Sequence, residues 1–197
     1  MCDQPKIPFE AGMAAFQVDI SHYGHLIMEQ DPLQDLKRQI TNKEISLPDA
    51  LARALPLLRG KVTDEKLMWL ASELQGFQNG LEFFQNHANE AALKEFPAYR
   101  IVTGKIWLLT PQGTLADLNN PMTKRERVFL SAPVSWLEEA LNDPNDTCLV
   151  DMTELTNLFA KGVGNVVCEC PKEHLRGILS IFRQRFIQVL DEASQVN

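Results

Sequence analysis

The strongest constraint on the fold of this 197-residue chain is a long apolar stripe near its C-terminus. Between Lys172 and Glu192 the apolar side chains recur every three or four residues, which places them on one face of an α-helix. Pro171 directly precedes this segment, and polar side chains occupy the other face. The sequence therefore predicts one long amphipathic helix, whose apolar face consists of Leu175, Ile178, Leu179, Phe182, Phe186, Val189 and Leu190.

A second helical unit is predicted over residues 46–76. Ser46 can begin a helix by accepting a hydrogen bond from the amide of residue 49. Gly60 can end that helix in a left-handed conformation. A further helix is expected to begin at Thr63 and to stop at Gly76. These signals together indicate a helical hairpin.

Between the helical parts the apolar period changes toward two, which is typical of strands. The change begins at Tyr99, and the extended segment continues to a turn at residues 111–113. Further strands are expected at residues 126–130, 148–150 and 165–170, and further helices at residues 81–96 and 153–161, from Asp31-Pro32, and from Ser135 with Glu138 at capping-box spacing.

Helices at both ends and short strands between them predict the α+β class. In this fold the helical hairpin and the long C-terminal helix pack on a small sheet of short strands. Residues 1–30 contain prolines and glycines without a sustained period, so they are expected to form an irregular N-terminal extension. Residues 31–197 are then a single domain.

Composition limits the environment and the partners of the chain. The 26 acidic and 19 basic residues give a net charge of −7, which provides no general attraction to nucleic acid. No run of about 18 apolar residues is present, so no membrane span is expected. The first thirty residues lack the basic start and unbroken apolar core of a secretory signal. We therefore expect a cytoplasmic protein whose cysteines (Cys2, Cys148, Cys168 and Cys170) are reduced.

Several short motifs follow one another in order along the chain. They are Ser46-Leu-x-Asp49-Ala50-Leu51, Asp64-Glu65-x-Leu67-x-Trp69, Glu73-Leu74-x-Gly76-Phe77, Pro97-x-Tyr99-Arg100, and Pro171-Lys172 followed by Leu175-x-x-Ile178-Leu179-x-x-Phe182-Arg183-x-Arg185. Over roughly residues 33–190, this pattern resembles the AbiTii family of bacterial abortive-infection proteins. The most discriminating positions, which we take as candidate site residues, are Trp69, Glu73, Gly76, Phe77, Pro97, Tyr99 and Arg100.

The resemblance implies a role in phage defence, and it brings neither an agreed reaction nor catalytic residues. The chain departs from the family pattern in residues 78–95, which form a long insertion before Pro97. Phe77 stands where tyrosine is commoner, and residues 1–30 match no part of the pattern.

Glu73 and Arg100 are charged residues beside apolar neighbours, and two interpretations apply to them. They could form an ion pair that locks the hairpin to the following extended segment, with Trp69 and Tyr99 packed around it. They could instead be a catalytic pair. We prefer the ion pair.

The nearest approach to a metal site is Cys168, Cys170 and His174, because thiolates and imidazole suit zinc. The alternative, which we prefer, is a buried strand with small apolar cysteines and a surface histidine on the next helix. His22 and His25 form a second weak pair. Cys148 would need a base within reach to act as a nucleophile. No nucleophile elbow, phosphate loop or dinucleotide fingerprint occurs, so we expect no metal and no cofactor.

Lys124-Arg125-Glu126-Arg127 is the main basic cluster, and we interpret it as a solvated surface patch rather than a nucleic-acid contact. The sequence as a whole favours a non-catalytic interaction or regulatory module with a protein partner, and it leaves homo-oligomerisation open. The alternative is a toxin-like enzyme that acts on nucleic acid or nucleotides through scattered acids and histidines.

Overall fold

The computed structural model describes residues 31–86, 94–124 and 126–195. These residues belong to one unit that begins at Asp31. The predicted N-terminal extension, residues 1–30, lies outside the described residues, and so do Cys2, His22 and His25 within it.

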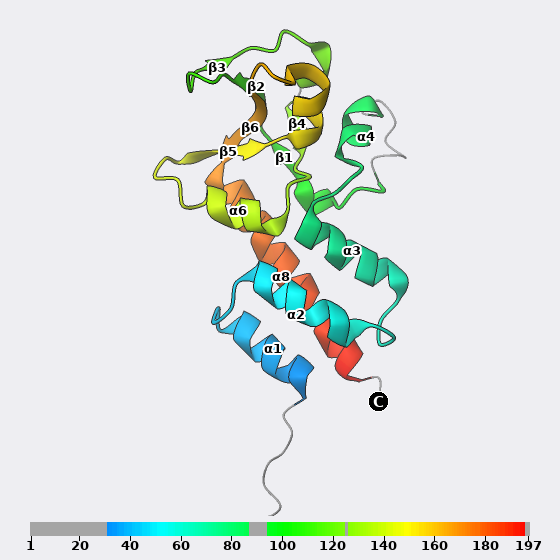
Figure 1. Cartoon of the computed structure of the whole chain (residues 1–197). Coiled ribbons are helices and arrows are strands. Elements are labelled where there is room, and N and C mark those ends of the chain that lie inside the picture. Colours follow the sequence, from blue (N-terminus) through cyan, green and yellow to red (C-terminus); the bar gives the residue numbers. More distant parts are fainter. Residues whose placement is uncertain (1–30, 87–93, 125, 196–197) are drawn as a thin grey trace, which may run out of the picture. The chain divides into compact units, whose positions relative to one another are not determined.

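The described unit has an α+β fold, which confirms the predicted class (Figure 1). Its α-helices are α1 (Pro32–Thr41), α2 (Leu47–Leu58), α3 (Asp64–Gln75), α4 (Gly80–Gln85), α6 (Val134–Ala140), α7 (Thr153–Leu155) and α8 (Lys172–Ser194). Shorter turns of other helix types are η2 (Ala98–Arg100), η3 (Pro121–Thr123) and η4 (Thr156–Ala160). The strands are β1 (Ile101–Thr103), β2 (Lys105–Leu109), β3 (Leu115–Ala116), β4 (Arg127–Phe129), β5 (Thr147–Asp151) and β6 (Asn165–Pro171).

The helical hairpin forms where its capping residues predict. The Ser46 side chain accepts a hydrogen bond from the Asp49 amide at 3.2 Å, so it caps α2. Gly60 follows the helix with φ of 75°. Thr63 precedes α3 as expected, although its side chain makes no capping bond. Gly76 ends α3 with φ of 90°, a conformation that glycine adopts without strain.

The strands form two antiparallel groups. β1 pairs with β4, and a four-stranded sheet has the order β3-β2-β6-β5. In that sheet Ile106 lies opposite Cys168, and Cys168 lies opposite Val150. All three side chains are buried, so this face of the sheet belongs to the core.

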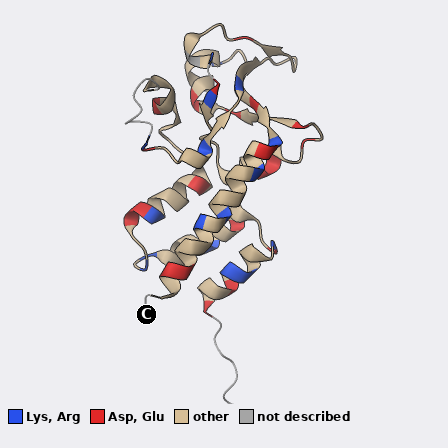
Figure 2. Ribbon diagram, turned by 180° about the vertical axis from the view of Figure 1, so that it is seen from behind, with Lys and Arg blue, Asp and Glu red and all other residues tan. Residues whose placement is uncertain are grey.

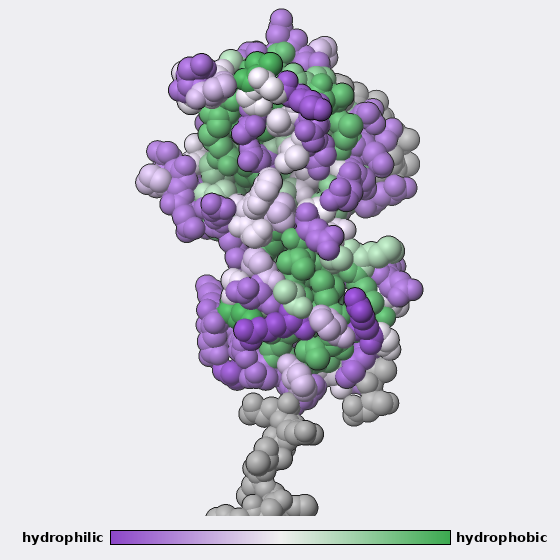
Figure 3. Space-filling view, in the orientation of Figure 1, coloured by the Kyte–Doolittle hydropathy of each residue, from purple (hydrophilic) through white to green (hydrophobic). Residues whose placement is uncertain are grey.

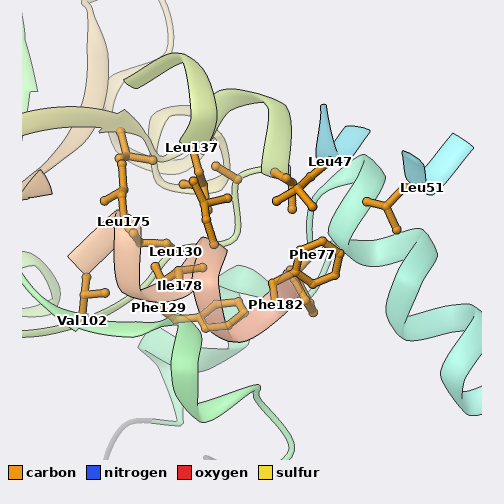
Figure 4. Close-up of a cluster of buried hydrophobic side chains, with 14 of the residues drawn as sticks. Leu47, Leu51, Phe77, Val102, Phe129, Leu130, Leu137, Leu175, Ile178 and Phe182 are labelled. Atoms are coloured by element: carbon orange, nitrogen blue, oxygen red, sulfur yellow. The ribbon is translucent and has the colours of Figure 1, made fainter. Parts of the chain in front are cut away.

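Helix α8 joins the helical and strand-bearing parts through one apolar core. Its seven predicted apolar positions are all buried. Figure 4 shows Ile178 and Phe182 of α8 in one buried cluster with Leu47 of α2 and Phe129 of β4. At 23 residues, α8 is about 34 Å long, which is enough to contact both parts.

Ion pairs on the surface add to the contacts of α8. Lys37 of α1 lies 2.5 Å from Asp191, and Lys66 of α3 pairs with Glu192. Figure 2 shows charges of both signs along these helices. Each such exposed pair contributes about 1 kcal/mol or less, so the apolar stripe holds α8 in place.

Three local predictions need correction. Tyr99 and Arg100 lie in the single turn η2, and the strand begins only at Ile101, because the Arg100 side chain turns into the core. Ser135 is not the N-cap of α6, because that helix begins one residue earlier, at Val134. The Glu138 carboxylate accepts a hydrogen bond from the Leu47 amide at 3.3 Å and not from a capping-box amide. Of the helix predicted over residues 81–96, the described part is helical only as far as Gln85.

Among the described residues, no helix combines the length and the apolar character needed to cross a membrane.

Two glycines offer a matched test of the packing. A Cβ atom on Gly164 would lie 2.4 Å from the Leu109 carbonyl oxygen, whereas a Cβ atom on Gly177 of α8 would meet nothing within 4 Å. We expect Gly164→Ala to lower the free energy of unfolding by about 1–3 kcal/mol, because a backbone atom must move. Gly177→Ala should raise it by about 0.5–1 kcal/mol through helix propensity. Denaturant unfolding measures both, and equal changes would contradict the packing.

Candidate functional site

The candidate site residues from α3 and η2 meet at a buried ion pair. Glu73 of α3 and Arg100 of η2 both have 0% of their surface exposed. An Arg100 guanidinium nitrogen, Nη2, donates to Glu73 Oε2. The structure thus contains the pair that we preferred from the sequence, formed between residues 27 positions apart.

The second oxygen of Glu73 is also occupied. The Tyr99 hydroxyl donates to Glu73 Oε1, and the Trp69 indole nitrogen donates to the Tyr99 oxygen at 2.8 Å. The Glu73 carboxylate therefore accepts from two donors, and the hydroxyl between Glu73 and Trp69 both donates and accepts. Trp69 and Tyr99 lie around the pair, as predicted from the sequence.

Arg100 has a second set of partners in the segment after β4. Its Nη1 donates to the Ala132 carbonyl at 2.7 Å and to the Leu130 carbonyl at 3.2 Å. The Phe77 ring centroid lies 5.3 Å from the guanidinium carbon, a cation–π contact. Nε of Arg100 is buried without a hydrogen-bond partner among the described residues.

Gly76, Phe77 and Pro97 set the course of the backbone around the pair. The Phe77 amide donates to the Ser131 carbonyl at 2.8 Å, directly after the turn at Gly76. A Cβ atom on Gly76 would lie 3.1 Å from that same oxygen. The Pro97 carbonyl accepts from the Arg100 amide at 2.8 Å and closes η2.

The hydroxyl of Tyr99 is held in its neutral form. Burial raises the pKa of Tyr99 well above its usual value, and the adjacent negative charge of Glu73 raises it further. A neutral phenol can donate to Glu73, whereas a phenolate would repel it. The network therefore needs this proton.

An open cleft of about 830 Å³ lies beside the buried network. Trp69, Phe77 and Pro97 contribute to its walls, together with Met68, which is 65% exposed. Arg185 of α8 reaches the cleft, with its guanidinium 4.8 Å from the Tyr99 ring centroid. On the face drawn in Figure 3, apolar residues also lie among hydrophilic ones across the helical region.

The three candidate metal ligands, Cys168, Cys170 and His174, do not form a metal-binding group. Cys168 and Cys170 are buried on the core face of β6, while His174 is half-buried and its Nδ1 lies 3.1 Å from the Thr103 carbonyl oxygen. Among the described residues no three His, Cys, Asp or Glu side chains form a group that could hold a metal ion. None of these three residues lines the cleft.

The remaining candidates lie away from the cleft as well. The Cys148 sulfur is 3.9 Å from that of Cys170, and burial raises the pKa of the Cys148 thiol to about 12. Such a thiol is protonated at neutral pH and is a weak nucleophile. In the basic cluster Lys124 and Arg127 are exposed, and Arg125 lies outside the described residues.

Sequence reasoning missed the carbonyl acceptors at Leu130 and Ala132, because no side-chain pattern marks a backbone acceptor. It also gave no role to Arg185, although this residue belongs to the closing motif. Only its spacing from the apolar stripe, one turn beyond Phe182, could have suggested that it lies near Trp69, which contacts Phe182 at 5.7 Å between ring centroids.

Comparisons with models of protein families, with curated proteins and with solved structures gave no match to this chain.

The ion pair predicts a large loss of stability when one partner is removed. Arg100→Ala leaves the Glu73 carboxylate buried and without its cation, so the free energy of unfolding should fall by about 3–5 kcal/mol. Arg38→Ala is the matched control, because Arg38 pairs with Asp35 and Glu44 on the surface, where water screens the charges; its effect should be far smaller. Equal losses in denaturant unfolding would contradict the role of the buried pair.

A double substitution separates charge from packing. Glu73→Leu combined with Arg100→Met leaves no buried charge, so it should destabilise less than Arg100→Ala alone. A larger loss in the double variant would contradict the dominance of the buried charge, and would show that the Glu73 bond to the Tyr99 hydroxyl, which only the double variant removes, matters more.

The raised pKa of Tyr99 predicts a pH dependence of stability. The folded state favours the neutral phenol, so this stabilisation is complete below pH about 10 and is lost as the pH rises above that value. At neutral pH, Tyr99→Phe should cost about 1–3 kcal/mol, because Trp69 and Glu73 lose a partner. Unfolding curves at increasing alkaline pH should show the difference between the two proteins shrinking. A constant difference would contradict the assignment.

Proposed function

We propose that this protein is a bacterial abortive-infection protein that acts in the cytoplasm as a non-catalytic binding module. The ordered motifs that resemble the AbiTii family support the link to phage defence. The geometry of the motif residues supports binding over catalysis.

The observation that carries the proposal is a division among these residues. The charged ones, Glu73 and Arg100, are fully buried and hydrogen-bonded to protein groups, so neither can touch a substrate. The apolar ones, Trp69, Phe77 and Pro97, line the cleft. A filled charged interior beside an open apolar surface is the arrangement expected of a protein that presents a surface to a partner.

The cleft fits a segment of a partner protein that inserts an apolar side chain. Met68 offers a flexible thioether, and Trp69 offers an aromatic wall beside it. Charged groups of both signs, Glu65, Glu95 and Arg185, lie around the apolar residues. An apolar centre with a polar rim is the usual composition of a protein interface. The partner is either encoded with this protein or is a component of the phage.

A phage challenge tests the proposal in cells. Cells carrying the wild-type gene, alone or with its neighbouring genes, should survive as a population when infected. Met68→Glu places a charge in the cleft and should lower the affinity for the partner by about tenfold or more, and with it the protection. Leu158→Glu is the control, since Leu158 is 50% exposed and lies outside the cleft. Equal protection by both variants would contradict a binding role for the cleft.

The rival enzyme hypothesis has its own test. Purified protein incubated with RNA, DNA and nucleoside triphosphates should show no turnover under the proposal. Turnover that Met68→Glu abolishes, while the variant stays folded by circular dichroism, would overturn the non-catalytic role.

A further inference from the structure

A second surface lies at the free edge of the four-stranded sheet. β5 is the last strand in the order β3-β2-β6-β5 and pairs only with β6. In the described part of the chain no strand covers its other edge. An uncovered edge presents backbone N–H and C=O groups that another chain can pair with.

Two hydrogen bonds at the ends of β5 fix which residues face that edge. The Met152 amide donates to the Val166 carbonyl at 2.9 Å, and the Lys172 amide donates to the Asp146 carbonyl at 3.0 Å. In an antiparallel pair the backbone groups of alternate residues face the partner strand. The backbone N–H and C=O groups of the even-numbered residues from Asp146 to Met152 therefore face β6. The backbone groups of Leu149 and Asp151 then face outward.

A groove follows this edge. It has a volume of about 280 Å³ and lies between β5 and α6, which are neighbours in Figure 1. Trp136 of α6 and Leu149 of β5 line it, and these side chains are 42% and 39% exposed. Glu139 and Asp151 also line the groove, and no basic side chain does.

We propose that this groove binds an extended segment of a partner protein as an added strand beside β5. The outward backbone groups of Leu149 and Asp151 would pair with that segment. An apolar side chain of the segment would lie against Trp136, and a Lys or Arg two residues along, on the same face of the added strand, would face Glu139 and Asp151. This surface is separate from the Met68 cleft, so the two proposals stand or fall independently.

Charge argues against a second copy of the chain as the occupant. The chain carries a net charge of −7, and the groove itself is acidic. Two copies joined at β5 would bring two acidic grooves together, which like-charge repulsion disfavours. A basic, apolar segment removes this repulsion.

The probe for the experiment is a fluorescein-labelled hexapeptide, Val-Val-Lys-Lys-Val-Val, which presents valine and lysine on both faces when extended. It is titrated into the full-length protein and followed by fluorescence anisotropy. We expect saturable binding. N-methylation of alternate backbone amides should weaken it by about tenfold or more, because methylated edges cannot pair. The hexapeptide Val-Val-Glu-Glu-Val-Val should bind at least about tenfold more weakly than the lysine peptide.

Variants of the protein locate the site. Trp136→Ala should weaken binding by about tenfold, while Leu158→Ala, an exposed position outside the groove, should leave it unchanged. Leu149→Pro should abolish binding without unfolding the sheet, because its amide faces away from β6. Circular dichroism verifies the fold, and Trp136→Ala keeps the test valid if the proline variant unfolds.

Several results would overturn the proposal. These are no binding of the lysine peptide, equal binding of the methylated peptide, or equal binding by the Trp136→Ala variant. A dimer of the wild-type protein in light scattering that Leu149→Pro dissociates would also overturn it, because the edge would then belong to a second copy.

Discussion

The buried pair of Glu73 and Arg100 is the constraint on which the rest of the described structure depends. An ionised carboxylate and a guanidinium without exposed surface are costly unless their hydrogen-bonding groups find partners. Except for Arg100 Nε, the chain supplies these partners from three separate segments: the end of α3, the turn η2, and the carbonyls that follow β4. Displacing α3 or η2 would leave a charge without its partner, and displacing the carbonyls would leave Arg100 Nη1 without an acceptor, so the three segments are held in one arrangement.

The same pair explains where the open surface lies. Trp69 stands one helical turn before Glu73, and Tyr99 directly precedes Arg100, so the aromatic residues close the pair from one side. Trp69 and Phe77 then form part of the cleft wall. Arg185 reaches Tyr99 from α8, whose apolar stripe is buried in the common core. The cleft is thus a consequence of how the charges are buried.

Local signals in the sequence predicted a large part of this fold. The caps at Asp31 and Ser46, the glycine stops and the stripe of α8 depend on nearby residues, and all are present. Tertiary contacts decided the rest. Arg100 interrupts the alternating strand pattern because its hydrogen-bond partners lie in other segments. The Glu138 side chain accepts a hydrogen bond from the Leu47 amide at the start of α2, and not from an amide of its own helix. Backbone acceptors and the free edge of β5 have no signature in a single sequence, so neither could be predicted.

The separation between buried charges and open surfaces also decides how loss of function should be interpreted. A substitution at Glu73 or Arg100 lowers the population of folded protein, so an inactive variant at either position carries no evidence of catalysis. Substitutions at Met68 or Trp136 change exposed side chains and leave the ion pair intact. Only positions of this second kind can distinguish a binding surface from a reaction centre in this protein.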